Sequence, residues 1–255
     1  MSILINSWPI GIGIALVVVG PLGQFAGWPS GIIATAVFAA VGFFLVLAVY
    51  RAPSLATAGS AVGFGLRELS RREWQLLMLG SLPWFLYNAA FQIVISFLPL
   101  FFVGKGLDIS HAGSLVALNT VMFVVGVQAG GLLPKDARRR DPLCHMAIFG
   151  WCLTLLLLAS GIAPLPWIVV GGLLGGVPAA ALVSMPAEFL RPESRNAGMG
   201  IFYTIYYFGC ALLPAAAGAL YEASGGPAAL WMATAVALCC VPIIWLFRRA
   251  MTNRP

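Results

Sequence analysis

Residues 134–141 read Pro-Lys-Asp-Ala-Arg-Arg-Arg-Asp and lie between two long apolar segments, residues 109–133 and 143–162. This short connection holds four of the 14 Lys and Arg residues in the 255-residue chain. A basic run between apolar segments of about 20 residues each is typical of a connection between membrane-spanning helices. The stretch therefore predicts an all-α integral membrane protein and gives a reference point for its orientation.

The same alternation of apolar and basic stretches extends along the whole chain. The apolar segments are residues 4–25, 28–50, 74–102, 109–133, 143–162, 165–187, 197–221 and 228–247. No basic residue precedes the first segment, and the successive connections and the tail hold 0, 4, 1, 4, 0, 2, 0 and 3 Lys and Arg residues. Every second connection is thus poor in basic residues, and Lys105 is the one exception among them. Because basic residues concentrate on the cytoplasmic side, we expect eight transmembrane helices with both termini in the cytoplasm.

Composition agrees with this class. The chain is 61% hydrophobic and 9% charged, whereas a soluble domain is typically about 25% charged. The net charge of +6 would suggest nucleic acid as a partner of a soluble protein, but here the basic residues are accounted for by orientation. We therefore expect a multi-pass protein of the cell inner membrane, in contact with the lipid bilayer and without a nucleic-acid partner.

The longest connection divides the chain. We predict two transmembrane helices in residues 1–50, a cytoplasmic linker in residues 51–73, a six-helix bundle in residues 74–249 and a cytoplasmic tail in residues 250–255. The linker is rich in Ala, Gly and Ser at its centre and carries Arg and Glu at its ends. Its last part, Leu66–Trp74, is typical of a short helix at the membrane surface.

Ionisable residues are almost absent from the predicted middle of the membrane. His111 and His145 lie at helix ends on opposite sides, and the chain has no H-E-x-x-H motif. The five cysteines lie in or beside apolar segments without a C-x-x-C pair, which favours packing over a disulfide or metal site. The sequence thus offers no catalytic constellation, and we expect neither an enzyme nor a bound cofactor or metal.

Uncharged polar and aromatic residues instead recur at helical spacing. In the third segment Ser81, Trp84, Asn88, Gln92 and Ser96 share one face, with Tyr87 beside it. The fourth and seventh segments add Asn119 with Thr120 and Tyr203 with Tyr206 and Tyr207. Amides and phenols are unfavourable in lipid unless they find partners, so these faces should point into the bundle.

Two interpretations of these faces remain open. The residues line a solvated cavity that binds a small solute, or they tie helices together through hydrogen bonds of about 0.6 kcal/mol each. The stripe of Trp84, Asn88 and Gln92 favours a cavity. Asn119 by itself favours a hydrogen bond between helices, and the three tyrosines fit either interpretation. The candidate cavity residues are Trp84, Tyr87, Asn88, Gln92, Asn119, Thr120, Tyr203, Tyr206 and Tyr207.

Four stretches together resemble one known family. Residues 6–11 and 20–23, the basic linker 51–73, the loop 131–140 and the loop 188–198 resemble a major facilitator superfamily (MFS) transporter from its fifth helix to its twelfth. The loop 131–140 lacks the glycine that the family places before its final arginines. The small-residue-rich helices are closest to cyanate and organic-anion transporters of that family.

The resemblance implies a function and a mechanism. Secondary transporters of this kind bind a small solute between two bundles, which rock to open the site alternately to the two sides. The third, fourth, sixth and seventh segments would correspond to the cavity-lining helices of the second bundle. The resemblance also allows a coupling proton as a partner. It implies that the family's first four helices are missing, and a missing N-terminal bundle or a homodimer would then complete the site.

The basic loops carry candidates for a cytoplasmic latch. If the resemblance holds, the latch would be formed by Asp136, Arg138, Arg139, Arg140, Glu188, Arg191 and Arg195. Orientation of the helices alone explains these charges equally well. Two alternatives to transport also stay open: a truncated transporter fragment without activity of its own, and a membrane assembly subunit or membrane enzyme of unrelated fold.

Overall fold

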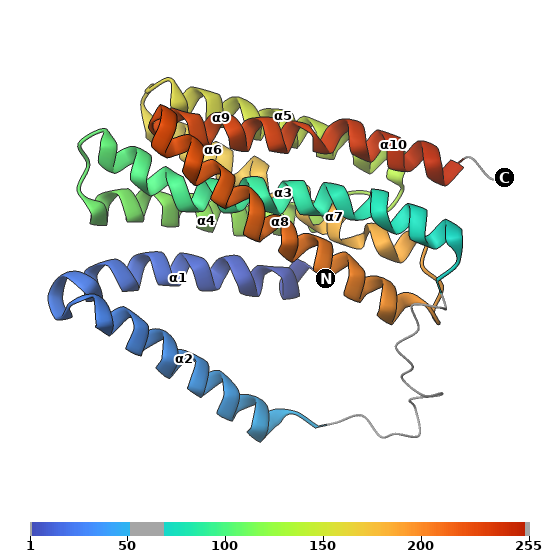
Figure 1. The fold of residues 1–255 in the computed structure, drawn as a ribbon, viewed down its shortest axis with the longest axis horizontal. Coiled ribbons are helices and arrows are strands. Elements are labelled where there is room, and N and C mark those ends of the chain that lie inside the picture. The colour runs from blue at the N-terminus through green and yellow to red at the C-terminus, as the bar shows by residue number, and fades with distance from the viewer. Residues whose placement is uncertain (1, 52–68, 253–255) are drawn as a thin grey trace.

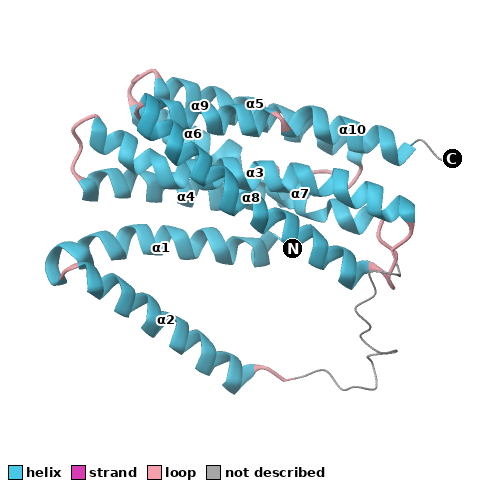
Figure 2. Cartoon of the chain, viewed as in Figure 1, coloured by secondary structure: helices cyan, strands magenta, loops and turns pink. Residues whose placement is uncertain are grey.

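The computed structural model describes residues 2–51 and 69–252, and within them it contains helices and no strand. The chain is all-α, as the sequence predicts (Figures 1 and 2). The elements are α1 (Ser2–Ala26), α2 (Trp28–Val49), α3 (Arg71–Gly104), α4 (Ile109–Gly131), α5 (Ala137–Ala159), α6 (Pro164–Gly176), α7 (Ala179–Ser184), the 3-10 helix η3 (Met185–Glu188), α8 (Arg195–Ser224), α9 (Gly226–Leu238) and α10 (Cys240–Thr252).

Eight helical stretches of the described chain are long and apolar enough to cross a membrane, which confirms the predicted number of spans. Two of them are interrupted: α6, α7 and η3 follow one another in one span, and α9 and α10 in another. The fifth span begins at Ala137 rather than at residue 143. Its early start follows from Asp136, which caps the helix by accepting a hydrogen bond from the backbone of Arg138.

Helices α3 to α10 form one bundle, with α1 lying along α4 and α2 leading away from the rest (Figure 1). The starts of α3, α5 and α8 and the end of α10 lie together at one end of the bundle, on the right in Figure 1 and here called the basic end. Gly31 is the one buried residue of α2, so this helix presents apolar side chains nearly all round. Such a surface suits contact with lipid or with another helix.

The linker lies largely outside the described residues. Leu69 and Ser70 precede α3, so only the last part of the predicted surface helix at Leu66–Trp74 can be seen, and there Arg71 already begins α3. Ser70 and Glu73 form a reciprocal capping box at this start. The capping box fixes where the six-helix part of the chain begins.

The contact between α4 and α6 is made by glycines on both sides. Gly126 and Gly130 on α4 face Gly172 and Gly176 on α6, each pair at a G-x-x-x-G spacing. A Cβ atom on any of the four would overlap backbone atoms of the opposite helix. Small residues at this spacing let two helix backbones touch, so this glycine seam holds α4 and α6 in one fixed arrangement.

The span that continues from α6 is broken beside this seam. Pro178 has no N–H to continue the helical hydrogen bonding, and α6 ends at Gly176 while α7 begins at Ala179. The carbonyl of Gly175 accepts a hydrogen bond of 2.6 Å from the hydroxyl of Tyr87 on α3. A side chain of the neighbouring helix thus bonds to the backbone at the break, as is required for broken helices inside a membrane.

Candidate solute cavity

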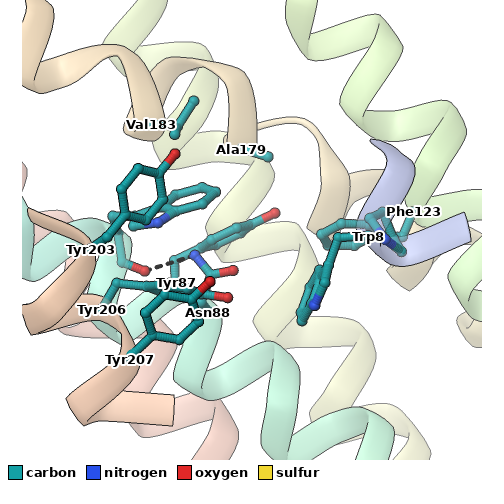
Figure 3. Close-up of a pocket in the computed structure, with 11 residues that line it drawn as sticks. Trp8, Tyr87, Asn88, Phe123, Ala179, Val183, Tyr203, Tyr206 and Tyr207 are labelled. Atoms are coloured by element: carbon teal, nitrogen blue, oxygen red, sulfur yellow. Dashed lines mark hydrogen bonds between the residues drawn. The ribbon is translucent and has the colours of Figure 1, made fainter. Parts of the chain in front are cut away.

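A cavity of about 200 Å³ lies between α1, α3, α4, α7 and α8 (Figure 3). Its walls contain aromatic rings, small apolar residues and one amide. The lining residues are Trp8, Pro9, Trp84, Tyr87, Asn88, Phe123, Ala179, Val183, Tyr203, Tyr206 and Tyr207. These residues come from helices far apart in the sequence, so the cavity exists only in the assembled bundle.

One wall is a packed group of rings on α3 and α8. The ring of Trp84 lies 5.9 Å from those of Tyr87 and Tyr206 and 6.3 Å from that of Phe202, measured between centroids. Trp84 is 6% exposed and Tyr87 is 1% exposed. Close ring packing with little exposure fixes the side chains, so this wall has a defined shape.

Asn88 brings the amide into the cavity. Its Nδ2 donates a hydrogen bond of 2.8 Å to the carbonyl of Trp84, shown as the dashed line in Figure 3. This bond fixes the side chain and leaves the amide oxygen to accept a hydrogen bond from a bound molecule. The indole Nε1 of Trp84, in the same wall, is buried and has no hydrogen-bond partner within the described part of the chain.

The opposite wall is supplied by α1. Trp8 lies across the cavity from Tyr203 and Tyr207 in Figure 3, and its ring is 5.6 Å from that of Phe91. Phe91 in turn packs at 4.2 Å against Phe123 on α4. The first helix therefore closes the cavity from one side.

Six of the nine predicted cavity residues line this cavity, namely Trp84, Tyr87, Asn88, Tyr203, Tyr206 and Tyr207. Gln92 is half-buried on the next turn of α3 and lies outside it. Asn119 donates a hydrogen bond of 2.8 Å to the carbonyl of Ile168 on α6. Thr120 bonds to Val116 in its own helix and borders an apolar groove between α1 and α4.

Sequence reasoning missed the apolar part of the lining. Phe123, Ala179 and Val183 are ordinary residues of apolar helices, and no spacing rule separates them from core residues. Trp8 and Pro9 lie in a segment with no polar stripe. Their place in the wall depends on how α1 docks on α4, where Asn6 Nδ2 donates to the carbonyl of Val124 at 3.3 Å.

A cluster of four charged residues joins three elements at the basic end. Arg140 of α5 bonds to Glu188 of η3 at 2.8 Å. Arg248 of α10 bonds to Asp141 at 2.6 Å and pairs with Glu188 as well. The four side chains alternate in charge, which is the arrangement that makes partly buried ion pairs favourable.

A second group of polar contacts joins the starts of α3 and α8. The carboxylate of Glu73, 5% exposed, accepts hydrogen bonds from Arg191 at 3.0 Å and from the hydroxyl of Ser194 at 2.6 Å. The hydrogen bond to Glu73 raises the pKa of the Arg191 guanidinium. Since α3 and α8 are two walls of the cavity, this group holds them together at one end.

The predicted latch residues divide into three groups. Arg140, Glu188 and Arg191 form ion pairs, Asp136 caps α5, and Arg138, Arg139 and Arg195 are exposed. Sequence reasoning did not identify Glu73, Asp141 or Arg248 as partners in these ion pairs. Glu73 lies 118 positions from Arg191, and Asp141 lies 107 positions from Arg248, so no local pattern reveals the contacts. All of these pairs lie within α3 to α10, so they bind parts of one bundle to each other.

Within residues 2–51 and 69–252, no three His, Cys, Asp or Glu side chains gather in a way that could hold a metal ion. His145 borders a pocket at the basic end beside Asp136, Arg138 and Glu188. The residues that line the solute cavity itself offer aromatic faces, hydroxyl groups and one amide.

The C-terminal part of the chain matches a known family. Residues 137–255 match the family model of the Major Facilitator Superfamily, the family whose motifs the sequence resembles. The match runs from the start of α5 to the end of the chain, and includes the four-charge cluster and the tyrosine wall of α8. No curated protein matches the chain.

Proposed function

We propose that the chain is a secondary transporter of the major facilitator superfamily, which moves a small polar or organic solute across the membrane. The observation that carries this proposal is the cavity between α1, α3 and α8, which holds one amide and several phenol groups inside a set of membrane-spanning helices. Polar groups at such a place are unfavourable unless they bind something. The family match over residues 137–255 supports the same conclusion.

The proposed mechanism is alternating access, and the walls of the cavity differ in a way that supports it. In α3, 17 of 34 residues are buried, but in α8 only five of 30 are. The wall on α3 is embedded in the bundle, whereas α8 packs along α3 and α9 but leaves most of its residues outside the bundle interior. Under this proposal α8 and α7, which begins after the break at Pro178, move relative to α3.

The basic end lies in the cytoplasm under this proposal, because it holds most of the Lys and Arg residues. The four-charge cluster and the Glu73 group then act within the bundle, and they keep its cytoplasmic end together while the cavity opens and closes. Among the predicted latch residues, the exposed Arg138, Arg139 and Arg195 are free of such packing and remain candidates for contacts with a second bundle.

The test is uptake by vesicles that contain the purified chain. A defined mixture of small uncharged, anionic and cationic organic solutes is added outside, and the contents of the vesicles are measured by mass spectrometry over time. We expect at least one solute to enter faster than it enters empty vesicles. Equal entry of every solute into both kinds of vesicle would contradict the proposal and favour the inactive fragment.

A further inference from the structure

The cavity is lined mainly by aromatic rings. Seven of its eleven lining residues are Trp, Tyr or Phe, and they stand on both sides of the space, with Trp8 opposite Tyr203 and Tyr207 (Figure 3). Two aromatic surfaces facing each other bind flat rings better than they bind flexible chains, because stacked rings keep their preferred offset geometry. The shape of the walls thus selects for a flat molecule.

The cavity has room for about one ring. Its volume is about 200 Å³. An apolar protein cavity of about 150 Å³ accepts benzene, so the present cavity accepts a single ring with a small substituent.

The charge of the lining sets the charge of the molecule. None of the described residues that line the cavity is Asp, Glu, Lys, Arg or His. An ion that leaves water for such a site loses its hydration without gaining an ion pair, whereas a neutral polar group needs only hydrogen bonds. The oxygen of Asn88 accepts such a bond, and Tyr203 and Tyr207 carry further hydroxyl groups in the lining.

We propose that the cavity binds a flat, uncharged, one-ring aromatic solute that carries a small hydrogen-bonding substituent. This inference rests on the proposed transport function and names its substrate class. The main rival class is organic cations, since aromatic faces also attract positive charge.

The first experiment compares four probes of nearly equal size, with the purified chain in detergent and binding measured by calorimetry. Nicotinamide is neutral and aromatic, nicotinate is the anionic analogue with a carboxylate in place of the amide, 1-methylnicotinamide is the cationic N-methyl analogue, and cyclohexanecarboxamide lacks the aromatic ring. We expect nicotinamide to bind at least about tenfold more tightly than each of the other three. Equal or tighter binding of either ion, or of the saturated ring, would overturn the inference.

The second experiment places the binding in the cavity by means of two tyrosines with similar exposure. Tyr207 is 65% exposed and lines the cavity, whereas Tyr50 is 68% exposed at the end of α2. Tyr207→Ala should weaken nicotinamide binding about 2- to 10-fold, the effect of losing one aromatic contact, and Tyr50→Ala should leave it unchanged. Equal effects of the two substitutions would overturn the assignment to this cavity.

The outcomes separate this inference from the proposed function. Uptake of an ionic solute by vesicles, together with preference for an ionic probe, would leave transport standing and refute the uncharged class. Tight nicotinamide binding without uptake of any solute would support the cavity's chemistry and refute transport by this chain.

Discussion

The glycine seam between α4 and α6 and the cavity between α3 and α8 lie in the same bundle, yet they are built in opposite ways. At the seam four glycines bring two backbones into contact, and an added Cβ has no room. At the cavity aromatic side chains from several helices surround a space of about 200 Å³. The comparison shows how one small bundle combines two kinds of contact. Where side chains are absent, two helices touch through their backbones and are fixed, and where aromatic rings line the helices, an open space remains.

The largest effect on stability is expected from a side chain placed in the glycine seam. Gly176→Leu would push a Cβ against the carbonyl of Phe123, and we expect the chain to lose about 3 kcal/mol or more of its stability or to fail to fold. The fraction of monodisperse protein after mild heating in detergent measures the effect. Gly42→Leu on α2, where nothing lies within 4 Å of the added atom, should behave as the unchanged chain does.

A smaller effect is expected at the basic end, where Glu73 joins the starts of α3 and α8. Glu73→Gln removes the charge that joins the starts of α3 and α8, and it should lower the free energy of unfolding by about 2 kcal/mol. Thermal unfolding at neutral pH tests this. The control is Glu193→Gln, an exposed carboxylate in the loop that holds Arg191 and Ser194. An equal shift in the two variants would show that the Glu73 contacts do not hold the walls together.

Next in size is the bond that joins the cavity wall to the broken helix. Tyr87→Phe removes the hydroxyl that donates to the carbonyl of Gly175, and it should reduce stability by about 1 kcal/mol with the ring packing unchanged. The melting temperature in detergent measures this loss. Tyr50→Phe at the exposed end of α2 should not shift it. If Tyr87→Phe also left the melting temperature unchanged, the carbonyl at the break would need no partner from α3.

The smallest expected effect distinguishes the two interpretations of Asn119. Its amide bonds to the carbonyl of Ile168 across the α4–α6 contact, so Asn119→Ala should lower stability by about 0.6 kcal/mol. Nicotinamide binding should stay the same, because Asn119 lies outside the cavity. A clear loss of binding with unchanged stability would reassign Asn119 to the solute site.

The spans and their order could be predicted from sequence because they depend on local quantities. Apolar length and basic connections are visible one segment at a time, and eight spans follow from them. The break at Cys239 was not predicted, because an interrupted helix keeps the same apolar composition as a continuous one. At Pro178 the sequence does carry a signal, since a proline after several glycines favours bending of a helix.

The cavity was only half predictable for a similar reason. The polar stripe of α3 identifies Trp84 and Asn88, because polar side chains at helical spacing must turn inward. Gln92 follows the same spacing and still lies outside, since the cavity extends along only part of α3. The wall formed by Trp8 depends on the docking of α1, which no periodicity within α1 reveals. The charged partners Glu73 and Arg248 escaped detection because each pairs with a residue more than a hundred positions away or on another helix.

The central claim is that the cavity opens in turn to both sides of the membrane. Its most direct test uses a chain whose native cysteines have been replaced and which carries Tyr203→Cys, a partly exposed position in the cavity wall. A membrane-impermeant maleimide is applied from either side of sealed vesicles. Met146→Cys, exposed on α5 at a similar number of residues from the start of its helix, is the control that faces away from the cavity. The account predicts labelling of the Tyr203→Cys variant from both sides and little labelling of the Met146→Cys variant from either. Labelling of the Tyr203→Cys variant from one side alone, or from neither, would contradict it.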